Sequence, residues 1–445
     1  MNVSKVHYYF HELVLPTILF MVLGGMTWAV RGCSGFGGSN GCLFAGITLA
    51  TAWWFLSYDP KQQSIRPYAN ALAVMAMTIG IAFSGSRGWM QWPAFFEGKI
   101  YTNYTANEFV PIPRYYGFIW QFISGIPWAG LGACFLAWFN CERKTTRQDW
   151  IIRIVCLVGG GFLAVILFNA LPNVFLPLYS SLQERYMDLE NNPNLRRLIN
   201  DNHSAMMHLG LYLGMLVAEI IRRDKRNVVL ILTVGLINGI GWSLLQNWKW
   251  AYTIWQGYNF NWWRCWETSG GVSIGLAYGI AYFLTNQPLQ SKDSIVIHKP
   301  KTERMTLFLT VFLCIAVSLR NGLKGWANIY LGNEEYWNKV LWIVFIPIIL
   351  IGIYLIVSHV KRHSKEECFA SNPIPKYAVI IWTVLLIQNF IAQIITGPWS
   401  NWIEFSFSLY YLFLFLISVA IIYHYHFLKL LGITNFTYNK RPPKN

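Results

Sequence analysis

The first long apolar run of the chain, residues 13–30, reads LVLPTILFMVLGGMTWAV and contains no charged residue. Its length matches the roughly 17–25 residues that an α-helix needs to cross a bilayer. A helix is the expected spanning element, because backbone groups inside a membrane must pair with one another. The run ends at Arg31-Gly32, and no small-residue cleavage site follows. We therefore expect an uncleaved first span and not a signal peptide.

Apolar runs of this kind recur along the whole chain. Of its 445 residues, 55% are hydrophobic and only 12% are charged, and the mean hydropathy is +0.36. About a quarter of the residues of a soluble domain are charged. The expected spans are residues 13–30, 41–57, 68–86, 116–139, 151–171, 204–221, 228–246, 268–285, 305–320, 340–358, 377–396 and 405–427. The sequence thus predicts an all-α polytopic membrane protein with about twelve transmembrane helices and no soluble domain.

The basic residues are unevenly distributed between the predicted connections. If the N-terminus is cytoplasmic, the segments on its side hold 23 of the 35 Lys and Arg residues but only 10 of the 20 acidic residues. This bias follows the positive-inside rule, and it explains the net charge of +15 without a nucleic-acid partner. We expect a multi-pass protein of the plasma (inner) membrane, with both termini cytoplasmic and the lipid bilayer as its surroundings.

Tryptophan is concentrated on the opposite side. Residues 242–266 alone contain seven Trp residues. Part of this enrichment is the aromatic belt found at membrane interfaces. A simple belt would be more even, however, because few tryptophans lie on the cytoplasmic side. The excess suggests stacking on sugar rings or contact with a lipid-linked glycan.

Several spans look like repeated hairpins. An outward span ends in a Gly- and Trp-rich stretch, and a return span opens with an aromatic and polar cluster, as in Trp120 to Gly125 and Trp266 to Gly270. The similarity is weak, although hairpin duplication is common in transporters. We divide the single membrane domain into two six-helix halves, residues 1–221 and 222–445.

The segment between the first two spans, residues 31–41, reads RGCSGFGGSNG. Its glycines permit positive φ and close backbone approach, and the amides that open the next span can receive an anion. One interpretation is a substrate loop that lines a cavity at membrane depth. The alternative is a tight turn between closely packed helices. The residues that would contact a substrate are Arg31, Gly35, Gly37, Gly38 and Asn40.

Three outward spans end in an arginine followed closely by a glycine: Arg31, Arg87 and Arg320. A structural explanation exists for each, because a cation complements the dipole at a helix C-terminus and glycine is favoured just beyond it. Arg31 and Arg87, in consecutive hairpins, are the better candidates for a shared anion site. A guanidinium group can hold a carboxylate or a phosphate through two parallel hydrogen bonds.

Two return spans open with a carboxylate. Glu267 follows Trp263 and Trp266, and Glu404 begins the last span. An acid at a helix N-terminus complements the helix dipole, but an acid at membrane depth can also bind a proton or a cation. We predict Trp263, Trp266 and Glu267 as substrate-binding residues. The candidates for proton or ion coupling are Glu267, Glu404 and His208, the last because imidazole titrates near neutral pH.

Other charged and sulfur-containing residues are predicted to be structural. Glu219 precedes Arg222 and Arg223, which indicates a local ion pair. The eight cysteines include no Cys-x-x-Cys pair, and no His spacing suits zinc. We therefore expect neither a metal nor another cofactor, and no residue is identified as catalytic.

The pattern favours a secondary transporter or permease for a small organic anion, with an acidic sugar as one candidate. No nucleotide-binding loop is apparent, so transport would be ion-coupled or facilitated. Two alternatives stay open. One is a membrane-embedded transferase acting on a lipid-linked or glycan substrate at the outer face, which would need paired carboxylates or a His-centred base. The other is a non-catalytic component of a larger membrane complex.

Overall fold

The protein is nearly all helical. The computed structural model describes residues 3–31, 38–58, 65–84, 91–245, 247–258, 260–289, 300–363, 374–396 and 402–430. Within these, eight helices are long and apolar enough to cross a membrane: Lys5–Val30, Tyr115–Trp138, Arg147–Ala170, Pro193–Ile221, Lys225–Ile254, Lys301–Tyr330, Glu334–Arg362 and Trp402–Leu428. The predicted class, an all-α membrane protein, is confirmed at this level.

The secondary-structure elements occur in the following order along the chain. They are α1 (Val3–Tyr9), the π-helix η1 (Phe10–Val14), α2 (Leu15–Arg31), α3 (Gly38–Ser57), α4 (Ala71–Ser84), α5 (Gln91–Phe96), β1 (Lys99–Asn103), β2 (Glu108–Pro111), α6 (Tyr115–Trp138), α7 (Arg147–Ala170), α8 (Pro172–Phe175), α9 (Gln183–Met187), α10 (Pro193–Ile221), α11 (Lys225–Leu245), the 3₁₀ helix η2 (Asn247–Lys249), α12 (Trp250–Ile254), α13 (Trp262–Thr285), α14 (Pro300–Tyr330), α15 (Glu334–Arg362), α16 (Ile374–Thr396) and α17 (Trp402–Leu430).

Each of the twelve predicted spans falls on one of these helices, but four of the helices do not meet the criteria of length and apolarity. Three apolar segments are shorter, namely Gly41–Ser57, Ala71–Ser84 and Lys376–Ile391. The fourth is α13, which is 24 residues long but rich in Gly, Ser, Thr and Tyr and so less apolar. The count of twelve spans and the internal repeats therefore stay predictions.

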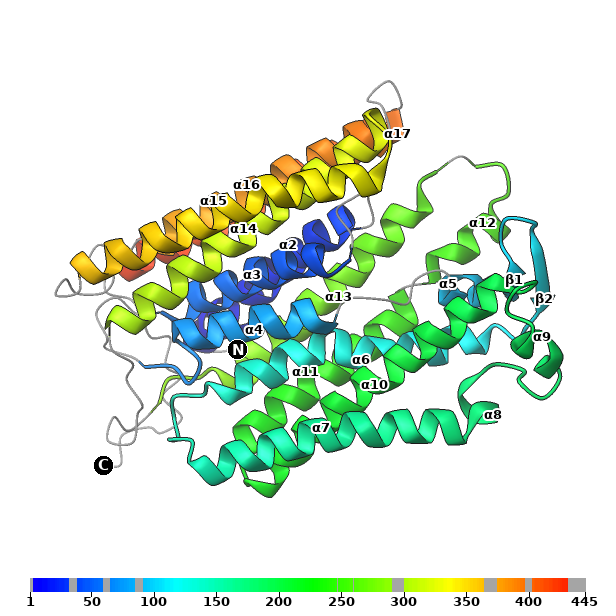
Figure 1. Ribbon diagram of the computed structural model, residues 1–445. Helices are drawn as coiled ribbons and strands as arrows, with labels where there is room; N and C mark the ends of the chain where they lie inside the picture. Colours follow the sequence, from blue (N-terminus) through cyan, green and yellow to red (C-terminus); the bar gives the residue numbers. More distant parts are fainter. Residues whose placement is uncertain are drawn as a thin grey trace.

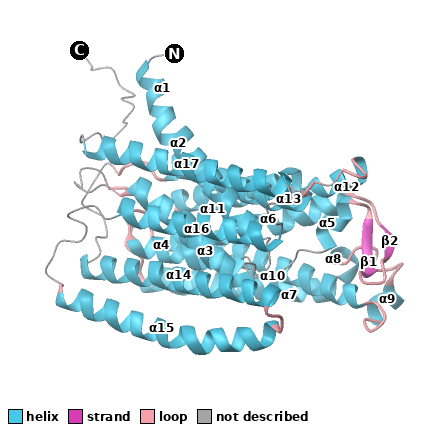
Figure 2. Cartoon of the chain, turned by 90° about the horizontal axis from the view of Figure 1, so that it is seen from above, coloured by secondary structure: helices cyan, strands magenta, loops and turns pink. Residues whose placement is uncertain are grey.

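The helices lie side by side in layers (Figure 1). α2 packs against α13, α11 joins α13 to α6, and α7 with α10 forms the outer layer beyond α6. On the other side, α14, α16 and α17 cover α2 and α3, and α15 lies outermost against α14. Figure 2 shows α15 along one edge of the bundle. Helices from residues 1–221 and from 222–445 thus pack against one another, as α2 does against α13 and α6 against α11.

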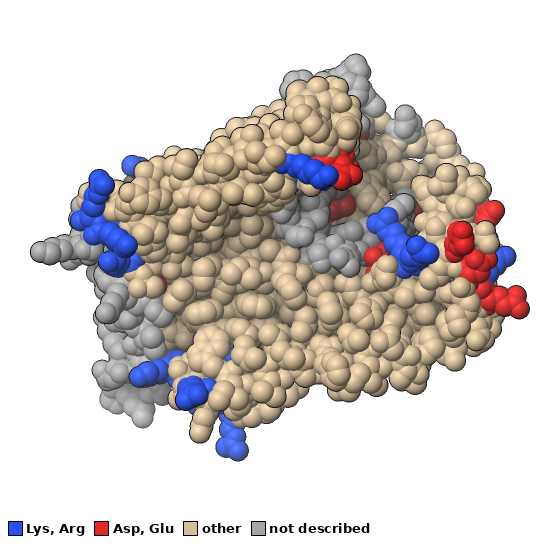
Figure 3. Space-filling model, in the orientation of Figure 1, with Lys and Arg blue, Asp and Glu red and all other residues tan. Residues whose placement is uncertain are grey.

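The bundle has two chemically different ends. We call one the basic end: it holds α1 and the connections at residues 139–146 and 222–224. We call the other the aromatic end: it holds α5, α12 and the β1–β2 hairpin (Figure 1). On the face shown in Figure 3, most of the visible Asp and Glu residues lie toward the aromatic end, and Lys and Arg lie at both ends.

Glycine allows α2 and α13 to approach closely. A Cβ atom on Gly275 would lie 2.2 Å from the carbonyl oxygen of Phe20, and one on Gly271 would lie 1.9 Å from that of Gly24. Gly271, Gly275 and Gly279 recur every fourth residue, which gives α13 the small-residue face typical of packed membrane helices. The contact also fixes the register, so that the end of α2 lies beside the first turns of α13.

A small cap covers the aromatic end. β1 and β2 pair antiparallel, with Lys99 opposite Pro111. A second hydrophobic cluster lies beneath them and includes Trp92, Ile100 and Trp120. The Trp92 and Trp120 rings are stacked with their centroids 6.0 Å apart, and Trp92 Nε1 donates to Asn202 Oδ1 over 2.8 Å. These contacts tie the cap to α6 and α10.

Candidate functional site

A buried ion pair joins the first turn of α13 to the first turn of α17. Arg264 Nε donates to Glu404 Oε2 at 2.9 Å, and Asn261 Nδ2 donates to Glu404 Oε1 at 2.8 Å. Asn261 also caps α13, because its Oδ1 accepts from the backbone N–H of Arg264. The Arg264 guanidinium lies 5.8 Å from the centre of the Phe407 ring. We call Asn261, Arg264 and Glu404 the aromatic-end contact of α17.

Because both charged groups are buried, breaking this contact has a large free-energy cost. Arg264 is 4% exposed and Glu404 6% exposed. Moving two charges out of water costs several kcal/mol per ion, and only a well-aligned partner offsets that cost. Either ion alone therefore needs a replacement counter-ion. A ligand with a carboxylate can fulfil that need for Arg264, since guanidinium and carboxylate geometry match.

The predicted residues of α13 lie within one turn of Arg264. Trp266 and Glu267 are buried, and Trp263 is half-buried with its ring stacked on Trp266 at a centroid distance of 4.9 Å. The structure thus places Trp263, Trp266 and Glu267 in the first turns of α13, and Arg264 links this end of the helix to Glu404. Arg264, between them in sequence, was missing from the predicted site.

A cluster of three tryptophans lies deeper in the bundle below this point. The Trp128 ring centroid is 4.3 Å from that of Trp242 and 5.9 Å from that of Trp28, and Trp242 Nε1 donates to the carbonyl oxygen of Gly270. Gln121 lies two helical turns from Trp128 on the same face of α6 and is 1% exposed. Neither of its amide atoms has a hydrogen-bond partner among the described residues.

The arginine and glycine residues predicted upstream are only partly described. The register of α2 on α13 places the backbone of Arg31 beside the first turn of α13. Gly38 begins α3, and Asn40 lies in its first turn. The side chains of Arg31 and Asn40 lie outside the described part of the structure, as do Gly35, Gly37 and Arg87 entirely. A shared anion site formed by Arg31 and Arg87 stays a prediction.

The third coupling candidate, His208, belongs to a different group of helices. It is buried in α10, which packs against α7 and α6, and its ring meets that of Phe83 edge-on at 5.4 Å. The third Arg-Gly residue, Arg320, is buried in α14, where it donates to the carbonyl oxygen of Asn338. Its guanidinium lies 4.4 Å from the centre of the Trp342 ring.

Toward its other end, α17 meets η1 through two histidines. His11 Nε2 lies 3.0 Å from His424 Nε2, and the Tyr425 hydroxyl donates to the carbonyl oxygen of His11. We call His11, His424 and Tyr425 the basic-end contact of α17. Beside it, Arg66 holds both carboxylate oxygens of Glu12, at 2.8 and 2.9 Å. Both side chains of this pair are buried.

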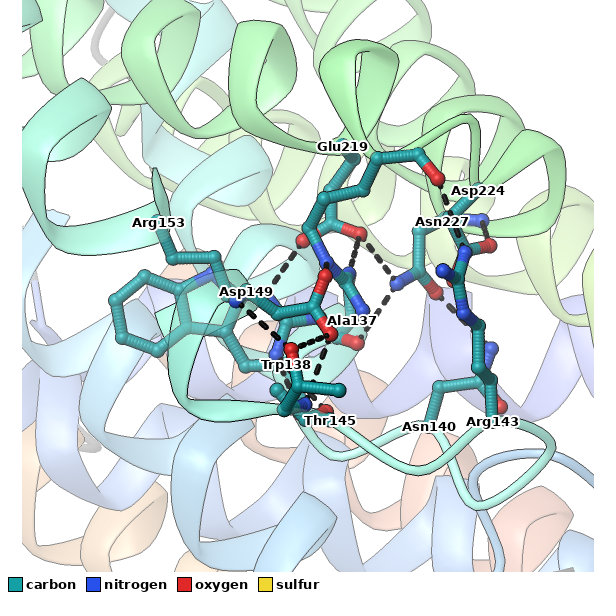
Figure 4. Close-up of polar contacts among 12 residues, drawn as sticks. Ala137, Trp138, Asn140, Arg143, Thr145, Asp149, Arg153, Glu219, Asp224 and Asn227 are labelled. Carbon is teal, nitrogen blue, oxygen red and sulfur yellow. Dashed lines mark hydrogen bonds and ion pairs between the residues drawn. The ribbon is translucent and has the colours of Figure 1, made fainter. Parts of the chain in front are cut away.

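A separate ion network lies at the basic end, between α7 and α10 (Figure 4). Glu219 accepts from Arg153 Nε at 2.7 Å and from Arg222 Nη1 at 2.5 Å. Arg222 Nε in turn donates to Asp149 at 2.8 Å, and Asn227 Nδ2 donates to Glu219 at 2.8 Å. We call Asp149, Arg153, Glu219 and Arg222 the α7–α10 network. The predicted pairing of Glu219 with Arg222 is confirmed, and its pairing with Arg153 was missed.

The residues that the sequence analysis did not predict share one sequence feature. Glu12 and His11 are polar groups in the first turns of an apolar helix, and Arg264 follows two tryptophans at the start of another. Ionisable residues inside membrane helices are costly and therefore need partners. Their positions indicate that these residues are paired. They do not identify the partners, which lie far away in the sequence.

No group of three or more His, Cys, Asp or Glu residues suited to a metal occurs in the described ranges. Comparisons of the whole chain with protein-family models, with curated proteins and with solved structures find no match. The contacts of the chain itself therefore carry the functional interpretation.

Proposed function

We propose that the protein is a secondary transporter for a small organic anion, with an acidic sugar as the first candidate substrate. The observation that carries the proposal is the pair of polar contacts on α17, one with α13 at the aromatic end and one with η1 toward the basic end. A transporter must close its substrate path alternately on each side of the membrane. Polar contacts at both ends of one helix provide two places where closure can be made and broken.

Arg264 supports an anionic substrate. Its carboxylate partner comes from α17, so a substrate carboxylate that replaced Glu404 would release α17 at the aromatic end while keeping the guanidinium paired. The exchange avoids the penalty of about 3–5 kcal/mol that follows removal of one partner from a buried pair. Substrate binding and opening would thereby be coupled.

The interior below Arg264 supports a ring-shaped, hydroxylated substrate. Trp28, Trp128 and Trp242 form a buried aromatic cluster, and within the described residues the amide of Gln121 has a donor and an acceptor without a hydrogen-bond partner. Leaving such an amide unsatisfied costs about 1–3 kcal/mol. A sugar acid can supply a carboxylate for Arg264, hydroxyl groups for Gln121 and C–H surface for the indole rings.

The proposal includes about twelve spans, both termini on the cytoplasmic side and a site near Arg31 and Arg87 at the outer face. The positive-inside count supports this orientation. The coincidence of all twelve apolar runs with helices supports the span number.

Counterflow in liposomes tests the proposal. Protein in liposomes loaded with unlabelled D-glucuronate should accumulate labelled D-glucuronate, whereas D-glucose should not be exchanged. Gluconate and lactate, tested in the same way, separate a sugar acid from a general carboxylate. If wild-type protein exchanges none of the three anions above protein-free liposomes, the transport proposal is wrong.

Two variants test the role of the Arg264 guanidinium group. R264Q/E404Q removes the pair without leaving a lone buried charge and should lower counterflow by more than about tenfold, as expected for loss of a charge-assisted hydrogen bond. R320Q is the matched control, because Arg320 is a buried arginine on α14. Equal counterflow in R264Q/E404Q and R320Q would remove Arg264 from the substrate site.

A further inference from the structure

His11 and His424 form a hydrogen bond between two imidazole rings. Their Nε2 atoms lie 3.0 Å apart, and the rings are nearly parallel, 5.2 Å apart and inclined by 21°. His11 Nδ1 lies 2.9 Å from the carbonyl oxygen of His7. A carbonyl oxygen only accepts, so His11 Nδ1 carries a hydrogen. In the neutral pair, His11 Nε2 is therefore the acceptor and His424 Nε2–H is the donor.

This arrangement limits the number of protons that the pair can hold. One added proton leaves a single hydrogen between the two Nε2 atoms, because either ring can be the imidazolium and the other the acceptor. That bond is charge-assisted and stronger than the neutral one. A second added proton puts a hydrogen on both Nε2 atoms and a positive charge on both rings, so the bond is lost and the rings repel.

The acid next to the pair, Glu12, belongs to an ion pair with Arg66. On α1, His7 has its ring centroid 4.1 Å from that of His11, and the Tyr8 hydroxyl donates to Gln287. Glu12 is held by both terminal nitrogens of Arg66, one of which also donates to the carbonyl oxygen of Asn286. The charge of Glu12 is therefore shared with Arg66.

Two more contacts bear on the histidine pair. On α17, the Tyr425 hydroxyl donates to the His11 carbonyl oxygen. From α13, Tyr282 places its ring 5.6 Å from the Arg66 guanidinium. Neither residue brings an acid to the pair.

The backbone at this point is a π-helix. The N–H of Leu15 bonds to the carbonyl oxygen of Phe10, five residues earlier, so one extra residue is accommodated between α1 and α2. Single π-turns inside helices often occur at functional sites. Here the wide turn allows adjacent residues, His11 and Glu12, both to be buried. His424, in contrast, is exposed, so a proton can reach the pair without crossing the bundle.

We propose that His11 and His424 are a proton-binding site that releases α17 from η1 when the pair takes its second proton. In the proposed transporter, this makes H⁺ the coupling ion and the basic-end contact the proton-controlled closure. The role in transport rests on the proposed function, whereas proton binding by the pair does not. The predicted coupling residues Glu267, Glu404 and His208 are not part of this site.

Hydrogen exchange tests the site without any substrate. Full-length protein in lipid nanodiscs is compared at about pH 5 and about pH 8, the range in which imidazole titrates, with rates corrected for intrinsic exchange. We expect backbone amides of residues 3–14 to exchange about three- to tenfold faster at the lower pH, as for loss of one hydrogen bond. In H424Q, whose Nε2–H₂ still donates but takes no proton, the difference should vanish.

The control is His426, two residues further along α17. H426Q removes another imidazole from the same helix and should keep the full pH difference. A wild-type protein with no pH difference in residues 3–14, or an H424Q protein with an unchanged one, would overturn the proposal. Because no anion is present, either result is independent of whether the protein transports glucuronate.

Discussion

The α7–α10 network and the aromatic-end contact of α17 both bury arginine against glutamate, but they are built differently. In the network, Glu219 is held by two arginines and by Asn227, and Arg153 also donates to the carbonyl oxygen of Trp138. In the aromatic-end contact, Arg264 donates to one carboxylate oxygen of Glu404 and Asn261 donates to the other.

We propose that the difference separates a structural ion cluster from one that a ligand can open. The network joins two helices that also pack through Gly160, Gly210 and Gly214, so its charges add to an interface that is already close. The aromatic-end contact joins α13, which packs mainly against α2 and α11, to α17, which packs against α16 and α2. A carboxylate that accepts hydrogen bonds from several side chains stabilises the fold. A single ion pair between two helices can be replaced by a ligand.

The largest effect is expected from Glu219→Gln. This change removes the charge that Arg153 and Arg222 share, and removal of one partner from a buried pair costs about 3–5 kcal/mol. Thermal unfolding in detergent should show a strongly lowered midpoint. Glu335→Gln is the control, because the Glu335–Lys339 pair is exposed and is expected to contribute less than about 1 kcal/mol. Equal midpoints for the two variants would contradict a structural role for the network.

Glu404→Gln should produce a smaller net effect that an anion reverses. The change leaves Arg264 without its carboxylate, and a substrate carboxylate no longer competes with Glu404. D-Glucuronate at about 100 times its Kd should then stabilise the variant by about 2.7 kcal/mol, the mass-action value for one site. It should shift the unfolding midpoint more in this variant than in wild type. Glu219→Gln should show no rescue, and a rescue there would remove the distinction between the two clusters.

The same contrast explains what could be predicted from the sequence. The helices follow from local apolar runs, and the Glu219–Arg222 pair follows from residues three positions apart on one helix. Arg264 and Glu404 are 140 positions apart, and His11 and His424 are 413 apart. Composition and spacing carry no information about such pairs, because helix packing decides which polar groups meet. The role of the glycine-rich segment at residues 31–41, which follows α2 in the sequence, is still a prediction.

The smallest effect is expected from Asp224→Asn, at the edge of the α7–α10 network. Asp224 caps α11 by accepting from the backbone N–H of Asn227, and burial raises the pKa of its carboxyl. A raised pKa in the folded state means that the charged form is disfavoured there, so wild-type stability increases as pH falls through that pKa. Asparagine caps a helix about as well as aspartate and carries no charge. The variant should therefore be equal to wild type or slightly more stable at neutral pH, by up to about 1 kcal/mol, and should lack this part of the pH dependence. Unfolding midpoints of the variant and of wild type, measured across the acidic range, test this prediction. A loss of several kcal/mol at neutral pH would mean that the α7–α10 network also depends on the charge of Asp224.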